Sequence, residues 1–383
     1  MTLSNALVGY EPVLDTNRSI TATRVSLVAA NAARPLSAAG AYTDLSSQWP
    51  EDAGNLIIDV FGGEADDELA GLTPKPNCWI GLPAKLADDP GQSTRIKKLA
   101  ESGFKVTLNG KLISRLPADL AAALEMAIVP IGCSAEKPFA CDGITSIEQA
   151  KAAFETGAKA AIGWPVDDLK ISSNQSANNP SFEVIGRLLA LVNANADPGE
   201  LEPVFKQDPS LSFRLLRYLN SAAFGLRVEV QSIQHAVMMI GMKRLKKWLA
   251  LLLATAARDP DLKPLMFASL RRGFTLEALV GDVLGEQSKD EAFILGVFSL
   301  LDKLFNESFE SLFSRLQIPE AVHDALVDNT GQYMPYLKLT KVLEGVPGKA
   351  TDDALTDAFI ERVDCNTALM KALGDASQTE NQK

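Results

Sequence analysis

Short apolar runs alternate with helical stretches over the first 166 residues of the chain. A hairpin is predicted first, because the runs ALVGYEPVLD and SITATRVSLV flank the turn-rich sequence DTNRS. Residues 94–102, 118–124 and 147–156 have helical spacing. Further runs have the length of strands: 55–61, 78–83, 104–110, 125–132, 139–144 and 159–166. Strands that alternate with helices form largely parallel sheets with covered faces, so this half predicts a (β/α) barrel, short for its class.

A polar segment then separates this half from one with a different pattern. Residues 167–180, DDLKISSNQSANNP, are rich in Ser and Asn and predict a linker. Beyond them the apolar residues recur at helical spacing, so residues 181–383 predict an all-helical domain with a C-terminal extension and a frayed tail. The expected organisation is therefore an α/β domain over residues 1–166 and a helical domain over 181–383. We expect the helical stretch 351–374 to pack on the helical bundle.

Composition and charge narrow the function classes. The chain has 383 residues, with 48 acids against 37 bases and a net charge of −11, which argues against broad binding of nucleic acid or anionic membranes. Four cysteines without a CxxC pair and only two histidines argue against a zinc site, and free thiols suit a reducing compartment. The N-terminus has no signal-peptide pattern, and the apolar stretch WLALLLATAA is about half a membrane span. A cytoplasmic protein with no membrane contact is expected.

Two segments of the first half resemble the EAL domain, a barrel that hydrolyses cyclic-di-GMP. YEPVLDTNRSITATRVSL resembles its first hairpin, and FACDGITSIEQAKAAFETGAKAAIGWPV resembles its closing segment. The resemblance covers residues 7–166 and is to the shortened barrel of EAL-HDOD signalling proteins. It implies that carboxylates and an Asn at the strand ends would hold two divalent metals that activate water.

The residues expected to bind those metals are missing. ITATRVSLV, which should carry the Glu of the EAL triplet, contains no acid, and Gly81 stands where another Glu is expected. Asn109 and Gly110 replace a pair of aspartates, the run MAIVPIG lacks the expected Lys and Asp, and the last expected Glu falls near Ile144. The resemblance therefore implies a degenerate barrel with no catalytic residues, no metal ligands and no cofactor.

Four residues of this barrel remain candidates for a role. Asp59 and Asp142 are isolated acids at strand ends, which we interpret as solvated or capping carboxylates rather than as residual metal ligands. Arg24 and Trp164 are candidate contacts at the barrel mouth for a cyclic dinucleotide bound without hydrolysis, although either could be structural. The short length also suggests a barrel with missing strands or helices, and the resulting gap could form a docking groove.

The second half resembles the HDOD domain. QDPSLSFRLLRYLNSAAFGLRVEVQSIQHAVMMIGMKRLKKWL contains, in order, a DP-x-L start, an N-S-x-x-F-G turn, an S-I-x-x-A helix and a basic-hydrophobic helix after a glycine. HDOD domains are similar to HD-GYP phosphodiesterases without their metal ligands. In the stretch EAFILGVFSLLDKLF (291–305), which predicts one long apolar helix, Ser299 and Leu300 stand where those enzymes have adjacent His and Asp. His235 and His323 are interpreted as structural or surface residues.

The HDOD signature also supplies the candidate partner surface. Its members from the first helix and turn are Arg214, Arg217, Tyr218, Asn220 and Phe224. Its basic members are Lys243, Arg244, Lys246 and Lys247. Positive charge at the start of a helix opposes the helix dipole, so acids of the same chain or an anionic partner should offset it. For the first group, packing and helix termination are the alternative roles.

The predicted fold is thus α/β plus all-α: a shortened, degenerate (β/α) EAL-like barrel followed by an all-helical HDOD domain. The predicted function is a non-catalytic bacterial signal-transduction or scaffold protein that acts through protein–protein interaction, with other signalling proteins as partners. The alternatives are a cyclic-di-GMP receptor without hydrolysis and, less favoured, an active phosphodiesterase. Nucleic-acid binding is disfavoured, and a homo-oligomer remains open.

Overall fold

The structure is a computed structural model that describes residues 3–111, 116–133, 138–166, 180–219, 230, 232–254, 262–285, 288–314 and 318–381. It divides into two compact units. The barrel unit comprises Met1–Leu169, Lys263–Phe267 and Pro335–Lys383, and the helical unit comprises Lys170–Leu262 and Ala268–Met334. Among the described helices, none combines the length and the apolar character that a bilayer crossing requires.

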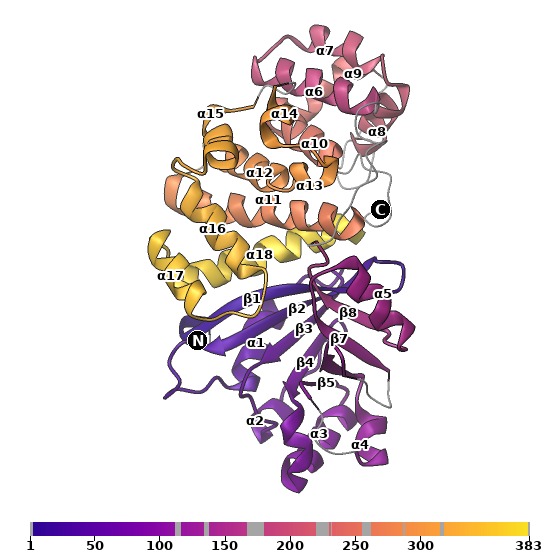
Figure 1. The fold of residues 1–383 in the computed structure, drawn as a ribbon, viewed down its shortest axis with the longest axis vertical. Helices are drawn as coiled ribbons and strands as arrows, with labels where there is room; N and C mark the ends of the chain where they lie inside the picture. Colours follow the sequence, from indigo (N-terminus) through magenta and orange to yellow (C-terminus); the bar gives the residue numbers. More distant parts are fainter. Residues whose placement is uncertain are drawn as a thin grey trace. The chain divides into compact units, whose positions relative to one another are not determined.

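Eight strands close into a barrel in the first unit (Figure 1). Its hairpin pairs β1 (Ala6–Leu14) with β2 (Ile20–Ala29), and β1 is also antiparallel to β8 (Ala160–Gly163). The other neighbours are parallel: β3 (Asn55–Val60), β4 (Cys78–Pro83), β5 (Lys105–Asn109), β6 (Met126–Pro130) and β7 (Phe139–Ile144). The expected fold class is confirmed. The expectation of a gap from missing strands is wrong, because all eight strands are present and the barrel is shortened in its connecting helices, such as α2 (Asp67–Ala70) and α4 (Ala118–Ala123).

Short helices and capped turns connect the strands of the barrel. The described ones are η1 (Leu3–Asn5), α1 (Ala38–Gln48), α2 (Asp67–Ala70), η2 (Ala84–Asp88), α3 (Pro90–Glu101), α4 (Ala118–Ala123) and α5 (Ile147–Glu155). The side chains of Ser37, Asp66, Asp89 and Ser146 each accept a hydrogen bond from a backbone N–H in the first turn of the helix that follows. Such caps satisfy donors that have no partner within the helix.

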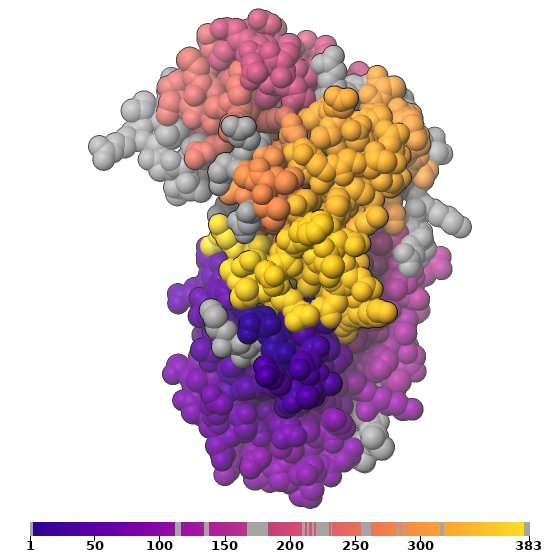
Figure 2. All heavy atoms as spheres, turned by 90° about the vertical axis from the view of Figure 1, so that its left-hand side faces the viewer, coloured from indigo at the N-terminus to yellow at the C-terminus, as the bar shows by residue number. Residues whose placement is uncertain are grey.

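The C-terminal segment belongs to the barrel unit and packs on its strands and helices. It contains α16 (Met334–Leu343), α17 (Lys349–Asp357) and α18 (Arg362–Asn381), and α18 packs against η1, β1 and α1. Figure 2 shows this segment, in yellow, against the indigo N-terminal strands. The prediction that residues 351–374 pack on the bundle, and the domain range 181–383 with it, is therefore wrong. Amphipathic spacing shows that one helix face is buried but does not show which partner buries it.

Buried polar contacts fix α18 on the barrel. Asn366 Nδ2 donates to the carbonyl oxygens of Leu3 at 2.8 Å and Ala6 at 2.9 Å, and Ser377 Oγ accepts from the backbone N–H of Gly54 at 2.9 Å. These carbonyls and the amide lie at strand entrances, where the sheet ladder leaves backbone groups without partners. The segment after the helical unit thus completes the barrel unit, and the helical unit is an insertion in it.

The helical unit contains the HDOD-like stretch. Its described elements are α6 (Pro180–Asn193), α7 (Pro198–Phe205), α8 (Pro209–Leu219), α9 (Ile233–Ile240), α10 (Met242–Ala254), α11 (Lys263–Leu284, which begins in the barrel unit), α12 (Lys289–Phe298), α13 (Leu301–Phe305), α14 (Phe309–Phe313), α15 (Glu320–His323) and the π-helical turn η6 (Asp324–Asp328). The single helix predicted over 291–305 is two helices, since the chain breaks at Ser299 and Leu300. The predicted linker, 167–180, lies outside the described residues apart from Pro180, where α6 begins.

Candidate functional site

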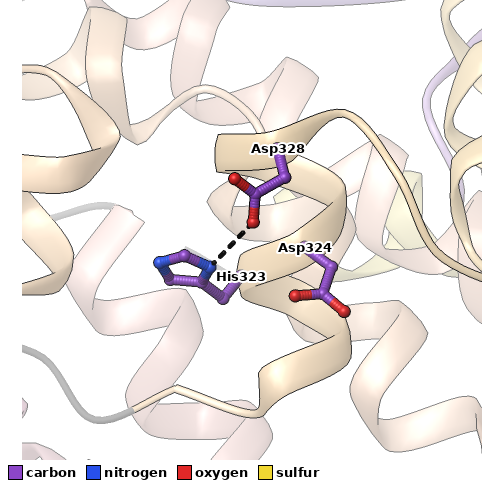
Figure 3. Close-up of side chains that lie close together, drawn as sticks. All are labelled: His323, Asp324 and Asp328. Atoms are coloured by element: carbon purple, nitrogen blue, oxygen red, sulfur yellow. Dashed lines mark ion pairs between the residues drawn. The ribbon is translucent and has the colours of Figure 1, made fainter.

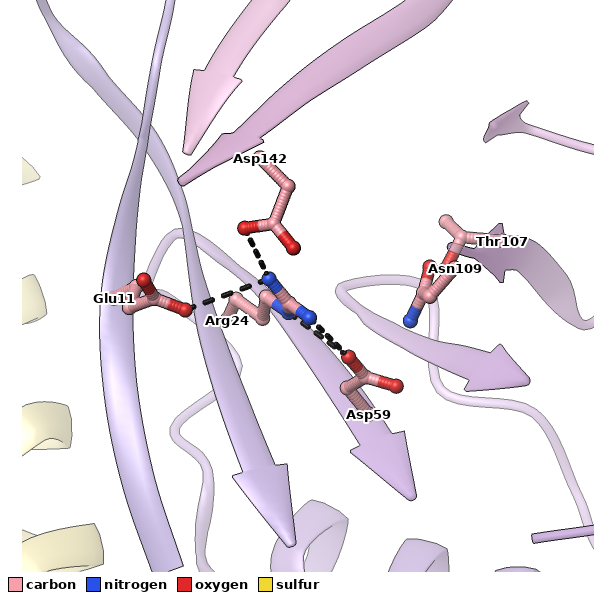
Figure 4. Close-up of polar contacts among 6 residues, drawn as sticks. All are labelled: Glu11, Arg24, Asp59, Thr107, Asn109 and Asp142. Carbon is pink, nitrogen blue, oxygen red and sulfur yellow. Dashed lines mark hydrogen bonds and ion pairs between the residues drawn. The ribbon is translucent and has the colours of Figure 1, made fainter. Parts of the chain in front are cut away.

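Four charged side chains meet inside the barrel at the carboxyl ends of its parallel strands (Figure 4). They are Arg24 on β2, Asp59 on β3, Asp142 on β7 and Glu11 on β1. Each lies two residues from a member of the apolar interior cluster, namely Ala22, Ile57, Ala140 and Val13 respectively. Because side chains alternate between the faces of a strand, residues two apart share a face, so all four point into the barrel. Active sites of (β/α) barrels lie at this end.

The guanidinium of Arg24 is the centre of this cluster. Its Nε and Nη2 both donate to Asp59 Oδ2, at 2.9 and 2.6 Å, and its Nη1 donates to Asp142 Oδ1 at 2.7 Å. Glu11 Oε2 lies 3.4 Å from Nη1. The Arg24 side chain is 2% exposed and that of Asp59 is 3% exposed, so this pairing takes place away from solvent.

Burial alone would lower the pKa of Arg24, but the charges of Asp59, Asp142 and Glu11 outweigh it and hold the pKa above its ordinary value. Arg24 is therefore permanently charged, and the cluster contains a fixed cation. An arginine paired in this way satisfies several carboxylates at once through its rigid set of donors.

Glu11 is the member of the cluster that titrates near neutrality. Burial raises the pKa of its carboxyl from 4.5 to about 7; Arg24 opposes this shift, whereas Asp142 and Asp59 add to it. One positive charge cannot offset three neighbouring carboxylates, so the acid that is most loosely paired with Arg24 keeps its proton.

Replacing Glu11 with Gln should therefore change how stability depends on pH. The raised pKa means that the folded protein holds this proton more tightly than the unfolded chain does. The proton on Glu11 therefore contributes its full share of folding stability below pH 4.5, and this share is lost as pH rises through about 7. Glu11→Gln keeps the neutral form at every pH. At pH 8 it should be more stable than the wild type by up to about 3 kcal/mol, at 1.36 kcal/mol per pKa unit, and the gain should vanish near pH 4.5.

The measurement is urea unfolding at a series of pH values. Glu125→Gln is the matched control, because Glu125 is exposed on the same domain. It should follow the wild-type curve throughout. Identical pH profiles for Glu11→Gln and the wild type would show that Glu11 is ionised in the folded protein at neutral pH.

A second polar pair borders the cluster on the β4–β5 side. Thr107 Oγ1 donates to Asn109 Oδ1 at 3.1 Å, and Figure 4 shows the Asn109 amide nitrogen directed towards the Arg24–Asp59 pair. A Cβ added at Gly81 would lie 2.4 Å from Asn109 Nδ2 and 3.2 Å from Asp59 Oδ1. The Asn109 side chain thus occupies the space that a residue larger than glycine would need at position 81, where the EAL resemblance expects Glu.

The donor set does not fit a pair of divalent cations. Hydrolysis in a two-metal barrel needs carboxylates that are free to share two cations about 3.5–4 Å apart. Here a permanent cation, Arg24, holds Asp59 and Asp142. Position 81, where a catalytic barrel would have Glu, is Gly in this chain, and a larger side chain there would displace Asn109. The arrangement can neutralise and fix the carboxylates, and we assign no reaction step to a metal at this place.

These contacts correct two sequence-based predictions. Asp59 and Asp142 are not isolated, because Arg24 pairs with both of them, although it lies 35 and 118 residues away from them in the chain. Arg24 is not an open ligand contact, since its donors are buried and used. Trp164 is half-buried and lies edge-on to Tyr10, with ring centroids 5.7 Å apart. Glu11 was not predicted; the signal was an acid at an inward position of the first hairpin.

The helical unit also has a guanidinium at the place of its expected metal ligands. Ser299, which stands at the expected His position, accepts a hydrogen bond from Arg272 Nη1 at 3.1 Å and donates to the carbonyl of Gly296 at 2.7 Å. Arg272 and its neighbour Arg271 are both buried. A Cβ on Gly296 would lie 2.4 Å from the Arg272 carbonyl oxygen, so α11 and α12 cross in close contact here.

The basic residues of the candidate partner surface are largely paired within the helical unit. Lys247 Nζ donates to Glu277 and lies 3.3 Å from Asp290 Oδ1, and Lys243 lies 3.8 Å from Asp290. Burial lowers the pKa of Lys246, against the nearby Glu291 and Asp290. These acids supply the charge that offsets the unfavourable helix start. The intramolecular explanation therefore accounts for Lys243, Lys246 and Lys247. Arg244 is exposed and interacts electrostatically with Tyr218 of the same unit.

The remaining members of that surface are only partly described. Arg214 and Tyr218 are exposed on α8, and the Tyr218 ring stacks on Trp248 with centroids 6.2 Å apart. Met238 and Met239 are exposed on α9, which packs against α8. Asn220, Phe224 and the side chain of Arg217 lie outside the described residues.

Comparison with known proteins places a domain in the second half. Residues 180–313 match the family model of the HDOD domain. The uncharacterized protein YuxH of Bacillus subtilis is 24% identical over 212 residues, 54% of this chain and 51% of that protein. The cyclic di-GMP phosphodiesterase CdgJ of Vibrio cholerae is 25% identical over 172 residues, 45% of this chain and 40% of that protein. The chain thus matches about half the length of these relatives or less.

Among solved structures, the cGMP-bound EAL enzyme Bd1971 is 11% identical, covering 42% of this chain and 60% of that one, with a TM-score of 0.31. The closed eight-stranded barrel and the HDOD match confirm the expected order of a (β/α) barrel followed by a helical HDOD domain.

Proposed function

We propose that this chain is a non-catalytic signal-transduction protein, related to cyclic-di-GMP signalling domains, that acts through contacts with other proteins. The observation that carries the proposal is the Arg24 guanidinium among Glu11, Asp59 and Asp142. It supplies, as part of the chain, the positive charge that a catalytic barrel would take from metal ions. The carboxylates are held by it and have no freedom to activate water.

The helical unit supports the same proposal independently. Ser299 accepts from Arg272 where an HD enzyme would have a metal-binding His, and Leu300 offers no ligand atom. In both halves a buried arginine thus stands in the region where the related enzymes bind metals. Under this proposal, each half retains the fold of a related enzyme but lacks the side chains that would bind the metal ions needed for hydrolysis.

The partner protein would bind to the exposed apolar residues of the HDOD signature region rather than to its lysines. Tyr218, Met238 and Met239 are exposed on packed helices, whereas Lys243 and Lys247 face acids of their own unit. Methionines and aromatic residues adapt to varied protein surfaces. Other signalling proteins remain the proposed class of partner, and nucleic acid is disfavoured by the net charge of −11.

The second candidate is an enzyme, and the relative CdgJ, which is named a cyclic di-GMP phosphodiesterase, favours it. The experiment that separates the candidates is calorimetric titration of the full-length protein with cyclic-di-GMP in Mg²⁺ and then Mn²⁺. The nucleotide is recovered afterwards and checked for cleavage. We expect neither heat nor cleavage.

The other outcomes are decisive in different ways. Binding without cleavage would replace the scaffold with a cyclic-di-GMP receptor. Cleavage that is lost in Asp59→Asn would establish a phosphodiesterase and overturn the proposal. Cleavage that persists in Asp59→Asn would point to a contaminating enzyme, and the assay would be repeated on protein purified from a host that lacks such enzymes.

A further inference from the structure

Three side chains with metal-binding atoms converge in the helical unit, outside the sites described above. They are His323 at the end of α15 and Asp324 and Asp328 in the π-helical turn η6 (Figure 3). One nitrogen or oxygen from each lies within 4.8 Å of the others. The side chains of His323 and Asp328 are 44% and 56% exposed, so an ion from solvent can reach them.

The π-helical turn is what brings the first and last of these residues together. In an α-helix, residues five apart point about 140° away from each other around the axis, at 3.6 residues per turn. A π-helical turn, closed by i→i+5 contacts, places such residues on one side instead. The backbone N–H of Asn329, a residue in the left-handed conformation with φ of 54°, bonds to the carbonyl of Asp324 and ends the turn.

The distance between the two best-placed donors matches a shared metal ion. His323 Nδ1 lies 3.5 Å from Asp328 Oδ2. A charge-assisted hydrogen bond between these atoms would be about 2.7–2.9 Å. Two ligands of a tetrahedral zinc ion, each about 2.1 Å from the metal, are about 3.4 Å apart. Asp324 is half-buried, and its carboxylate lies close enough to reach the same ion by rotation of the side chain.

The surroundings hold the imidazole in place. The rings of Phe313 and His323 pack with centroids 6.3 Å apart. Two carboxylates of the π-helical turn thus lie close to one imidazole, a combination that favours a divalent cation.

We propose that His323, Asp324 and Asp328 bind one first-row divalent metal ion, with Zn²⁺ as the best fit to a nitrogen and two carboxylate oxygens. Water completes the coordination. The ion bridges α15 and the π-helical turn, so its binding stabilises this end of the helical unit. The site has no role in phosphodiester hydrolysis and does not depend on the proposed function.

The test is calorimetric titration of the full-length protein with ZnCl₂, in a Cys133→Ser background because Cys133 is the one cysteine that is not buried. Variants His323→Gln and Asp328→Asn are compared with His235→Gln, the matched control at the chain's only other histidine. We expect one ion per chain in the background protein and in His235→Gln, and an affinity at least about tenfold lower in the other two variants, because each loses a direct ligand.

A folding check and a spectroscopic signature make the outcome clear. Circular dichroism identifies any variant that fails to fold, and Asp324→Asn then provides an independent ligand variant. Co²⁺ bound at this site should show visible bands without the intense near-ultraviolet absorption that a thiolate ligand produces. No Zn²⁺ binding, binding unchanged in both His323→Gln and Asp328→Asn, or a thiolate spectrum would each overturn the proposal.

Discussion

Replacing Arg24 with Gln should destabilise the barrel unit by about 3–5 kcal/mol at neutral pH, the cost of removing one partner from a buried ion pair. Asp59 loses both of its hydrogen bonds from the guanidinium, and Asp142 loses one. Glutamine keeps the polarity but supplies no charge, so buried carboxylates remain without a counter-ion. Urea unfolding followed by tryptophan fluorescence measures the loss, since Trp49 and Trp79 are buried in the barrel unit.

The pH dependence and a matched control distinguish this mechanism from lost packing. Burial raises the pKa of Glu11 to about 7, so this carboxyl takes up its proton on acidification, and the defect of Arg24→Gln should be smaller at pH 4.5 than at pH 7.5. Arg95→Gln changes an exposed arginine of α3 and should stay within about 0.5 kcal/mol of the wild type. If Arg24→Gln behaves like Arg95→Gln, or if its defect is the same at both pH values, the buried charge cluster does not stabilise the fold.

Deleting residues 335–383 should prevent the barrel unit from folding. The deletion removes α18, whose Leu369, Met370 and Leu373 are fully buried. Burying such side chains contributes about 1.5–3 kcal/mol each, and three of them together approach the whole stability of a typical domain, about 5–15 kcal/mol. Circular dichroism and limited proteolysis of the truncated chain should show loss of the protected barrel fragment.

A point substitution tests the same packing without removing the segment. Asn366→Ala leaves the carbonyls of Leu3 and Ala6 without their donor and should cost about 1–3 kcal/mol. Thr367→Ala, at the exposed next position, is the control and should have a small effect. A truncated chain that keeps a stable barrel, or Asn366→Ala as stable as the control, would return the segment to the helical bundle.

Most of the barrel could be predicted from the sequence because its strands are short, apolar and separated by helices. The runs 78–83 and 139–144 coincide with β4 and β7, and the hairpin lies where the turn-rich sequence DTNRS predicts it. The position of α18 could not be predicted in this way. Its apolar spacing requires a buried face, but its contact with η1 joins residues 363 positions apart in the chain.

The central cluster could be predicted only in part. A search of the sequence for metal-binding acids identifies Asp59 and Asp142 and shows that the other expected ligands are missing. The same search does not identify Arg24, because arginine is not a metal ligand. The missed signal was that Arg24 and Glu11 are cross-strand neighbours at inward positions of the first hairpin. For His323 and Asp328 no such signal exists, since α-helical spacing places them on different faces and only the π-helical turn unites them.

The measurement that tests the central claim most directly is a crystal structure of the full-length chain grown with Mn²⁺ and cyclic-di-GMP, with manganese located by its anomalous signal. The account predicts that the Arg24 guanidinium remains between Asp59 and Asp142, with no manganese bound to either carboxylate. Manganese at His323 would bear on the separate zinc proposal alone. Manganese bound between Asp59 and Asp142, with Arg24 displaced, would contradict the claim that this arginine replaces the metal ions of a catalytic barrel.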